Sequence, residues 1–238
     1  MEFVVLGLVV ALWAVYLVRR QRVWRGRLAE AIPVHSKFWR DRKGVAGERL
    51  LVAIGDSAAQ GIGASRPAHS YVGVLAKRLG SRYRVVNLGI SGATVRMAIE
   101  RELPALAALQ PDIVTVSIGA NDIAGFDERR FARDIRELFD ALPAHAIVAD
   151  LPSFHFLPAE RRVAVANRII RDAAAERHLV VAPLHARTRR QGLWGVSTQF
   201  AGDLFHPNDR GYRVWASAFE SAVDARAAAV EDGADDAG

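Results

Sequence analysis

The segment Leu50-Leu51-Val52-Ala53-Ile54-Gly55-Asp56-Ser57 joins an uninterrupted apolar run to three residues that favour a turn. Five consecutive apolar residues predict a buried strand, and the Gly, Asp and Ser that follow predict its end. In an open α/β sheet, the ligand crevice lies outside the carboxyl ends of the strands, so the hydroxyl of Ser57 is well placed for chemistry. Taken alone, the segment suits a polar turn with a helix cap equally well.

Strand-like and helical patterns alternate along the rest of the chain. Apolar runs predict strands at 83–88, 112–118, 145–151 and 179–182, and apolar residues at helical spacing predict helices at 69–80, 95–109, 128–141, 159–177 and 209–229. This alternation predicts an α/β fold, with a doubly wound parallel sheet between two layers of helices. We place this domain at 48–229, followed by a disordered acidic tail at 230–238.

Three more polar motifs occur at suitable distances from Ser57. Asn87-Leu88-Gly89-Ile90-Ser91-Gly92 and Ser117-Ile118-Gly119-Ala120-Asn121-Asp122 each follow a predicted strand, and Asp203-Leu204-Phe205-His206-Pro207 lies near the C-terminus. Together with the Gly-Asp-Ser segment, these blocks resemble the pattern of the SGNH hydrolases, also called GDSL esterases and lipases. The resemblance covers about residues 48–229. It implies a flavodoxin-like sheet of five strands and an enzyme that hydrolyses ester bonds without a cofactor.

The resemblance also implies a role for each polar residue of the motifs. Ser57 becomes the nucleophile, His206 its base and Asp203 the partner that orients the base, while Ser57, Gly92 and Asn121 form the oxyanion hole. These residue types suit the chemistry, because a serine hydroxyl is a weak nucleophile until an oriented imidazole takes its proton. The oxyanion of the tetrahedral intermediate, in turn, needs preorganised hydrogen-bond donors.

Other polar residues receive structural interpretations. Asp56 and Asp122 lie at turns, where an Asp more often bonds its own backbone. The chain has no cysteine, and no two of its seven histidines have the spacing of a metal motif with a carboxylate, so we predict no metal site. The segment Gly61-Ile62-Gly63-Ala64-Ser65-Arg66 lacks the third glycine of a dinucleotide-binding loop, so we predict no nucleotide cofactor.

Two apolar loops, 151–158 and 193–196, are expected to shape the substrate site. Their side chains Phe154, His155, Phe156 and Trp194 either line an acyl pocket or close the core. The first interpretation predicts a small-molecule acyl ester or thioester as substrate, as for an esterase, lipase or lysophospholipase. The alternatives are a carbohydrate O-deacetylase and a non-catalytic membrane-tethered interaction module. The complete set of motif residues argues against the non-catalytic module.

The N-terminus carries 16 uncharged residues, Phe3 to Val18, followed by five arginines within nine residues. We interpret residues 1–20 as a single-pass transmembrane anchor, although the run is shorter than the roughly 20 residues a spanning helix needs. A cleaved signal peptide and a buried core helix are the alternatives. The signal peptide is disfavoured because only Glu2 precedes the run and no cleavage site follows it.

The high isoelectric point of the chain arises from one segment. From Arg19 to Arg49 there are ten Lys or Arg and three Asp or Glu, a net charge of +7 compared with +6 for the whole chain. We therefore interpret 21–47 as a basic juxtamembrane linker that contacts anionic lipid headgroups, or else as a solvated linker, and we predict no nucleic-acid partner. Because basic flanks stay on the cytoplasmic side, the catalytic domain is expected in the cytoplasm, with an extracytoplasmic domain as the alternative.

Overall fold

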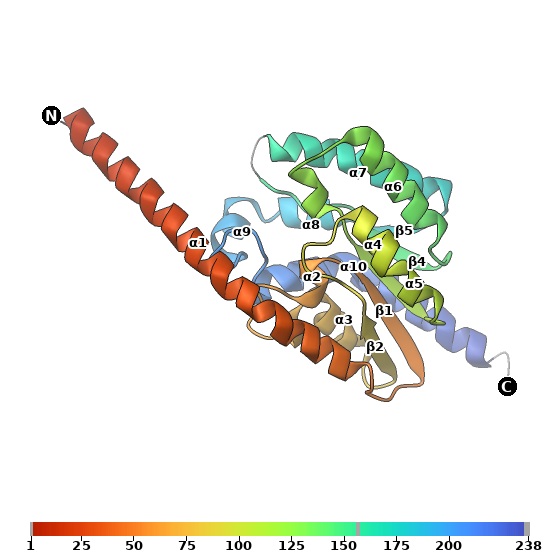
Figure 1. Ribbon diagram of the computed structural model, residues 1–238. Coiled ribbons are helices and arrows are strands. Elements are labelled where there is room, and N and C mark those ends of the chain that lie inside the picture. The colour runs from red at the N-terminus through yellow and green to blue at the C-terminus, as the bar shows by residue number, and fades with distance from the viewer. Residues whose placement is uncertain (1, 156–157, 236–238) are drawn as a thin grey trace.

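A computed structural model describes residues 2–155 and 158–235 and contains a five-stranded sheet between helices (Figure 1). The strands are β1 (Arg49–Gly55), β2 (Tyr83–Asn87), β3 (Ile113–Ser117), β4 (Ala146–Ala149) and β5 (Val180–Ala182). The α-helices are α1 (Glu2–Arg42), α2 (Ser57–Gln60), α3 (Tyr71–Leu79), α4 (Val95–Arg101), α5 (Leu103–Ala107), α6 (Glu128–Asp140), α7 (Ala159–Glu176), α8 (Leu184–Arg189), α9 (Gly192–Thr198) and α10 (Asp209–Asp235). Two short 3-10 helices are η1 (Pro67–His69) and η2 (Ala120–Ile123).

All pairs of neighbouring strands are parallel, and the strand order is β2-β1-β3-β4-β5. Strand β1 pairs with β2 from Arg49 opposite Tyr83 onward, and with β3 up to Gly55 opposite Ser117. This is the flavodoxin-like order, in which the ligand crevice opens beside β1 and β3. The predicted five-stranded parallel α/β fold is therefore confirmed.

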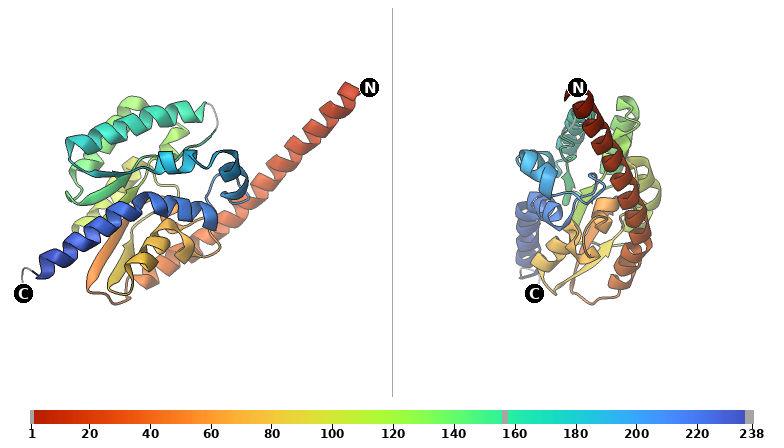
Figure 2. Two further views of the ribbon diagram at one scale, coloured as in Figure 1. Left: turned by 180° about the vertical axis from the view of Figure 1, so that it is seen from behind. Right: turned by 90° about the vertical axis from the view of Figure 1, so that its left-hand side faces the viewer.

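The sheet separates two apolar cores. Val52 and Ile54 of β1 face a core shared with α4, α5, α6 and α7, whereas Leu51 and Ala53 face a core shared with α3, α8 and α10. Side chains of a strand alternate between the faces of a sheet, so a strand that is apolar at every position is buried on both sides. Figures 1 and 2 show these two helical layers on opposite faces of the sheet.

The segment predicted as one helix at 95–109 forms two helices, α4 and α5. Pro104 lies in the first turn of α5, where a proline is tolerated, whereas inside a continuous helix it would remove a hydrogen bond and clash with the preceding turn. Glu102, between the two helices, is buried and accepts a 2.9 Å hydrogen bond from the backbone N–H of Gly55. The helix break thus places a carboxyl group against the end of the strand that precedes Ser57.

The N-terminal residues do not form the predicted membrane anchor. Within 2–155 and 158–235, the structure contains no helix that is long and apolar enough to cross a membrane. The prediction of an anchor at 1–20, of a membrane localisation and of a cytoplasmic domain behind that anchor is therefore wrong. The physical reason is that the uncharged run of 16 residues is shorter than the roughly 20 that a span requires, and α1 continues directly into the arginine-rich segment.

The segment interpreted as a basic linker is helical up to Arg42, because α1 continues through it. Its C-terminal part packs on the domain, and Trp39 is 2% exposed within the core that contains α3 and α10. Figures 1 and 2 show α1 passing along the domain, with its N-terminal part extending beyond the other elements. At the other end of the chain, α10 continues to Asp235, so the structure differs there from the predicted disordered tail, and 236–238 lie outside the described residues.

Candidate active site

Ser57 lies at a sharp turn between β1 and α2. Strand β1 ends at Gly55 and α2 begins at Ser57, so Asp56 alone connects them. Gly55 has no room for a side chain, because a Cβ atom would lie 2.5 Å from the carbonyl oxygen of Ser117 on β3. The close approach of the two strands thus fixes the backbone just before Ser57.

Ser57, His206 and Asp203 form a continuous hydrogen-bonded chain. The Nε2 atom of His206 lies 3.0 Å from the Oγ atom of Ser57, and its Nδ1 atom lies 2.7 Å from the Oδ2 atom of Asp203. The other carboxylate oxygen of Asp203 accepts hydrogen bonds from the backbone N–H groups of Phe205 and His206, each at 3.1 Å. Burial would raise the pKa of Asp203, but the hydrogen bond and charge of His206 and the backbone donors hold it below its ordinary value. Asp203 is therefore an anionic acceptor for the imidazole.

Gly92 and Asn121 line the same cavity as Ser57, which has a volume of about 260 Å³. Gly92 has a φ of 80°, in the left-handed region that glycine adopts without strain. The Nδ2 atom of Asn121 donates to the carbonyl oxygen of Ala93 at 2.9 Å and lies 3.4 Å from Oδ2 of Asp56. The contact to Asp56 is long and therefore weak, so a ligand beside Ser57 can replace it as the acceptor for this amide.

Asp56 acts as a helix cap, as predicted for an Asp at a turn. Its Oδ1 atom accepts a 2.8 Å hydrogen bond from the backbone N–H of Ala58 at the start of α2. Burial raises the pKa of Asp56 to about 6, against the opposing effects of that hydrogen bond and of nearby His206. Asp122 likewise accepts a hydrogen bond from the backbone N–H of Val95 at 3.1 Å.

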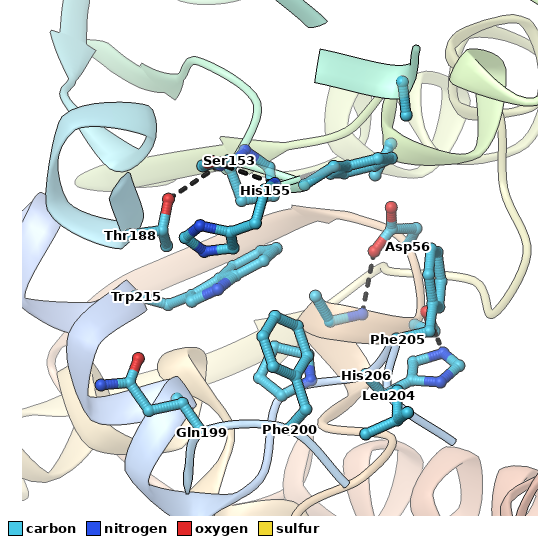
Figure 3. A pocket seen from close by; sticks show the side chains of 18 of the residues that line it. Asp56, Ser153, His155, Thr188, Gln199, Phe200, Leu204, Phe205, His206 and Trp215 are labelled. Atoms are coloured by element: carbon cyan, nitrogen blue, oxygen red, sulfur yellow. Dashed lines mark hydrogen bonds between the residues drawn. The ribbon is translucent and has the colours of Figure 1, made fainter. Parts of the chain in front are cut away.

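A second cavity, of about 190 Å³, also reaches Ser57. Phe154 and His155, which the sequence predicted as substrate-binding residues, both line it, and Figure 3 shows His155 beside this space. Phe156 lies outside the described residues. Trp194 is 69% exposed on α9 and is not part of the cavity lining, so the structure does not bring it to the site. The segment 193–196 is helical and presents this aromatic ring to solvent.

The loop that carries His155 is held by the half-buried carboxylate of Glu160. His155 has a φ of 60°, which a residue with a side chain rarely adopts. Glu160 accepts hydrogen bonds from the backbone N–H groups of Phe154 at 2.8 Å and His155 at 3.2 Å, and from Nε2 of His185 at 2.8 Å. These bonds fix the strained residue so that its ring borders the cavity.

Several residues around Ser57 were missed from the sequence. The second cavity is also lined by Phe200 and Leu204, which precede His206 in the chain, and by Trp215 on α10 (Figure 3). Helix α1 lines the first cavity with Leu28, Ala29 and Ile32. These three residues are spaced at about one turn of a helix, which indicates a buried face. The many arginines just before them favoured a solvated linker instead.

Within the part of the chain that the structure describes, no three His, Cys, Asp or Glu side chains gather where they could hold a metal ion. The groups that meet at Ser57 are instead a hydroxyl, an imidazole, a carboxylate and an amide. An oriented imidazole against a serine hydroxyl is the arrangement that nucleophilic catalysis by serine requires.

The chain belongs to the GDSL-like lipase/acylhydrolase family, whose sequence profile matches residues 53–214. The resemblance to the SGNH hydrolases is therefore confirmed, and the chain is an enzyme that hydrolyses ester bonds. The match begins within β1, so helix α1 lies outside it.

Relatives with known activities and structures agree with this assignment. Esterase TesA of Pseudomonas aeruginosa is 28% identical over 169 residues, which are 68% of this chain and 81% of TesA. A crystal structure of TesA has a TM-score of 0.64 at 25% identity and covers 75% of this chain and 99% of that one. LAE5, an α/β hydrolase from the metagenome of Lake Arreo, has a TM-score of 0.63 at 26% identity. The match covers 75% of this chain and 96% of LAE5. Axe2, an acetylxylan esterase from Geobacillus stearothermophilus, shares the fold, with a TM-score of 0.59 at 23% identity. The match covers 75% of this chain and 95% of Axe2.

Proposed function

We propose that the enzyme cleaves carboxylic esters or thioesters through an acyl-enzyme on Ser57. The observation that carries this proposal is the chain of hydrogen bonds from Ser57 through His206 to Asp203, at 3.0 and 2.7 Å. The 3.0 Å distance lets His206 take the proton of Ser57, and the 2.7 Å hydrogen bond to Asp203 orients the imidazole for that step.

In the first half-reaction, the Oγ atom of Ser57 attacks the carbonyl carbon while its proton moves to Nε2 of His206. Asp203 stabilises the resulting imidazolium, because it stays ionised and accepts from Nδ1. The carbonyl oxygen becomes an oxyanion, which receives hydrogen bonds from Asn121 Nδ2 and from the backbone N–H groups of Ser57 and Gly92. When the intermediate collapses, the bond to the leaving oxygen or sulfur breaks, and His206 gives its proton to that atom.

In the second half-reaction, water takes the place of the serine hydroxyl. His206 removes a proton from water as the water oxygen attacks the acyl carbon, and the oxyanion again forms in the same place. Collapse breaks the bond between the acyl carbon and Oγ of Ser57, and the proton returns to Oγ. The products are a carboxylic acid and the alcohol or thiol, and the enzyme regains its starting state.

The apolar lining of the cavity beside Phe154 favours an aliphatic acyl group as the substrate, of the kind that esterases, lipases and lysophospholipases act on. Phe200, Leu204 and Trp215 also line this cavity (Figure 3). Burial of apolar surface stabilises binding by about 0.8 kcal/mol for each methylene group. A small polar acetyl-sugar would leave this surface unused.

Covalent labelling tests the proposal. A fluorophosphonate should modify Ser57 in the native protein, which mass spectrometry of the digested protein can locate. Ser57→Ala should abolish labelling, whereas Ser217→Ala on α10 should not, since that hydroxyl only bonds the carbonyl oxygen of Val214. Labelling that persists in Ser57→Ala would refute the proposed nucleophile. Protection by acetylated sugars but not by aliphatic esters would instead support an O-deacetylase.

A further inference from the structure

Helix α1 is attached to the loop that carries Asp203. The Nε2 atom of Gln21 donates a 3.1 Å hydrogen bond to the backbone carbonyl of Asp203. One helical turn later, the indole of Trp24 lies against Gly202, where a Cβ atom would be only 2.2 Å from the ring. Any side chain at 202 would force the helix and the loop apart. The fit between a tryptophan and a glycine therefore fixes α1 beside the candidate active site.

Further along, α1 is attached to the helix that begins with Ser57. The backbone carbonyl of Gln60, the last residue of α2, lies 3.0 Å from Nδ1 of His35 and 3.1 Å from Nε1 of Trp39. The side-chain amide of Gln60 donates to Oγ of Ser36 at 3.1 Å. His35 and Trp39 are both buried. Because residues three or four apart lie on one face of a helix, these contacts and those of Gln21 and Trp24 belong to one continuous face of α1.

Between these two attachments, the same face of α1 covers a cavity instead of a protein surface. Leu28, Ala29 and Ile32 line the 260 Å³ cavity, together with Gly92 and the proposed nucleophile Ser57, and Arg25 of the same helix also borders it. This cavity and the 190 Å³ cavity beside Phe154 share Ser57, Asn121, Phe205 and His206. One is bounded by α1, which packs on the edge strand β2, and the other by the loop after β4. They therefore extend from Ser57 towards opposite edges of the sheet.

An ester has two arms, one on each side of the bond that breaks, and both must fit when its carbonyl carbon reaches Ser57. We infer that the cavity under α1 is a second substrate subsite, which binds one apolar arm while the cavity beside Phe154 binds the other. This inference rests on the proposed function. The substrate class is an ester or thioester with an aliphatic group of several carbons on both sides. Leu28, Ala29 and Ile32 then determine specificity, although α1 lies outside the family match at 53–214.

The test uses two series of esters with the full-length protein. In one series the acyl arm is acetyl and the alcohol grows from methyl to hexyl; in the other the alcohol is methyl and the acyl arm grows. For the native enzyme, kcat/KM measured by proton release should rise about fourfold per methylene in both series. Ala29→Trp fills the cavity under α1. The rise of kcat/KM with chain length, which we call the slope of a series, should therefore disappear in one of the two series and persist in the other. The matched control is Val34→Trp, since Val34 is 62% exposed on the same helix, and it should keep both slopes.

A second variant keeps the test informative if Ala29→Trp does not fold, as judged by circular dichroism. Leu28→Ala enlarges the same cavity and should move the optimum of one series towards longer chains. The inference is overturned if Ala29→Trp lowers kcat/KM equally for all esters, or leaves both slopes unchanged. Fluorophosphonate labelling of Ser57 separates this failure from failure of the proposed function. If Ser57 is labelled but the variants keep the chain-length dependence of the native enzyme, the second subsite alone is refuted. If the native protein is neither labelled nor active, the proposed function and the second subsite are both refuted.

Discussion

The cavity beside Phe154 predicts how the rate depends on acyl length. Its volume is about 190 Å³, and an apolar cavity of about 150 Å³ already accommodates benzene, so an acyl chain of about six to eight carbons should fill it. From acetyl to hexanoyl, four buried methylenes are worth about 3 kcal/mol, or roughly 200-fold in kcat/KM. Beyond about eight carbons the gain should end.

Ala159→Phe is the perturbation that tests this reasoning. Ala159 is the first residue of α7 and lines the cavity, so a phenyl group there occupies the space that the acyl chain would fill. The gain from acetyl to hexanoyl should then fall from roughly 200-fold to less than about tenfold. The control is Ala175→Phe, at an exposed position of the same helix, which should keep the gain of the native enzyme.

Initial rates with p-nitrophenyl esters of two to ten carbons measure both profiles. A flat profile in the native enzyme, or an optimum at acetyl, would show that the cavity does not bind the acyl arm. Equal losses for acetyl and hexanoyl esters in Ala159→Phe would also refute the reasoning, because they would indicate damage to the active site instead of a filled cavity. An acetyl optimum would favour the O-deacetylase alternative.

Three more predictions follow from the site. Ser57→Ala and His206→Ala should each lower kcat by at least roughly 10⁴-fold, and the double variant should lose little more, since the two act as a unit; additive losses in steady-state assays would contradict this. Asn121→Ala should lower kcat by roughly 100-fold to 1000-fold with little change in KM, whereas a change confined to KM would indicate a binding residue. Because the folded pKa of Asp56 is about 6 against an ordinary 3.8, its stabilising contribution is complete below pH 3.8 and is lost as pH rises through 6. Asp56→Asn should therefore gain up to about 3 kcal/mol in unfolding free energy relative to the native protein between pH 4 and 7, and chemical denaturation that shows no such trend would contradict it.

The sheet and the polar site residues could be predicted because their signals are local. Ser57 follows an apolar strand at once, and Asp203 and His206 are three residues apart, so short motifs carry most of the information. The parallel sheet follows from the alternation of strands and helices. The rest of the pocket depends on contacts between distant segments, as with Trp215 on α10, and no short motif reports such contacts.

Helix α1 was misinterpreted because its composition gave a stronger signal than its periodicity. An apolar run followed by arginines favours an anchor, yet Trp24, Ile32 and Trp39 share the face that packs on the domain. That face needs partners such as Gly202 and Gln60, which are far away in the sequence. Trp194 was the opposite case, since an aromatic residue in a predicted loop suggested a ligand contact, but it lies on the exposed side of α9.

The proposed nucleophile and base are separated by 149 residues in the chain. A ribosome makes the chain from the N-terminus at about 5 to 20 residues per second, so Ser57 is synthesised roughly 7 to 30 seconds before His206. During that interval the emerging chain holds the serine that follows β1 without the imidazole of His206, its proposed base. Under the proposed mechanism, Ser57 can therefore act as a nucleophile only after the segment that carries Asp203 and His206 has also been made.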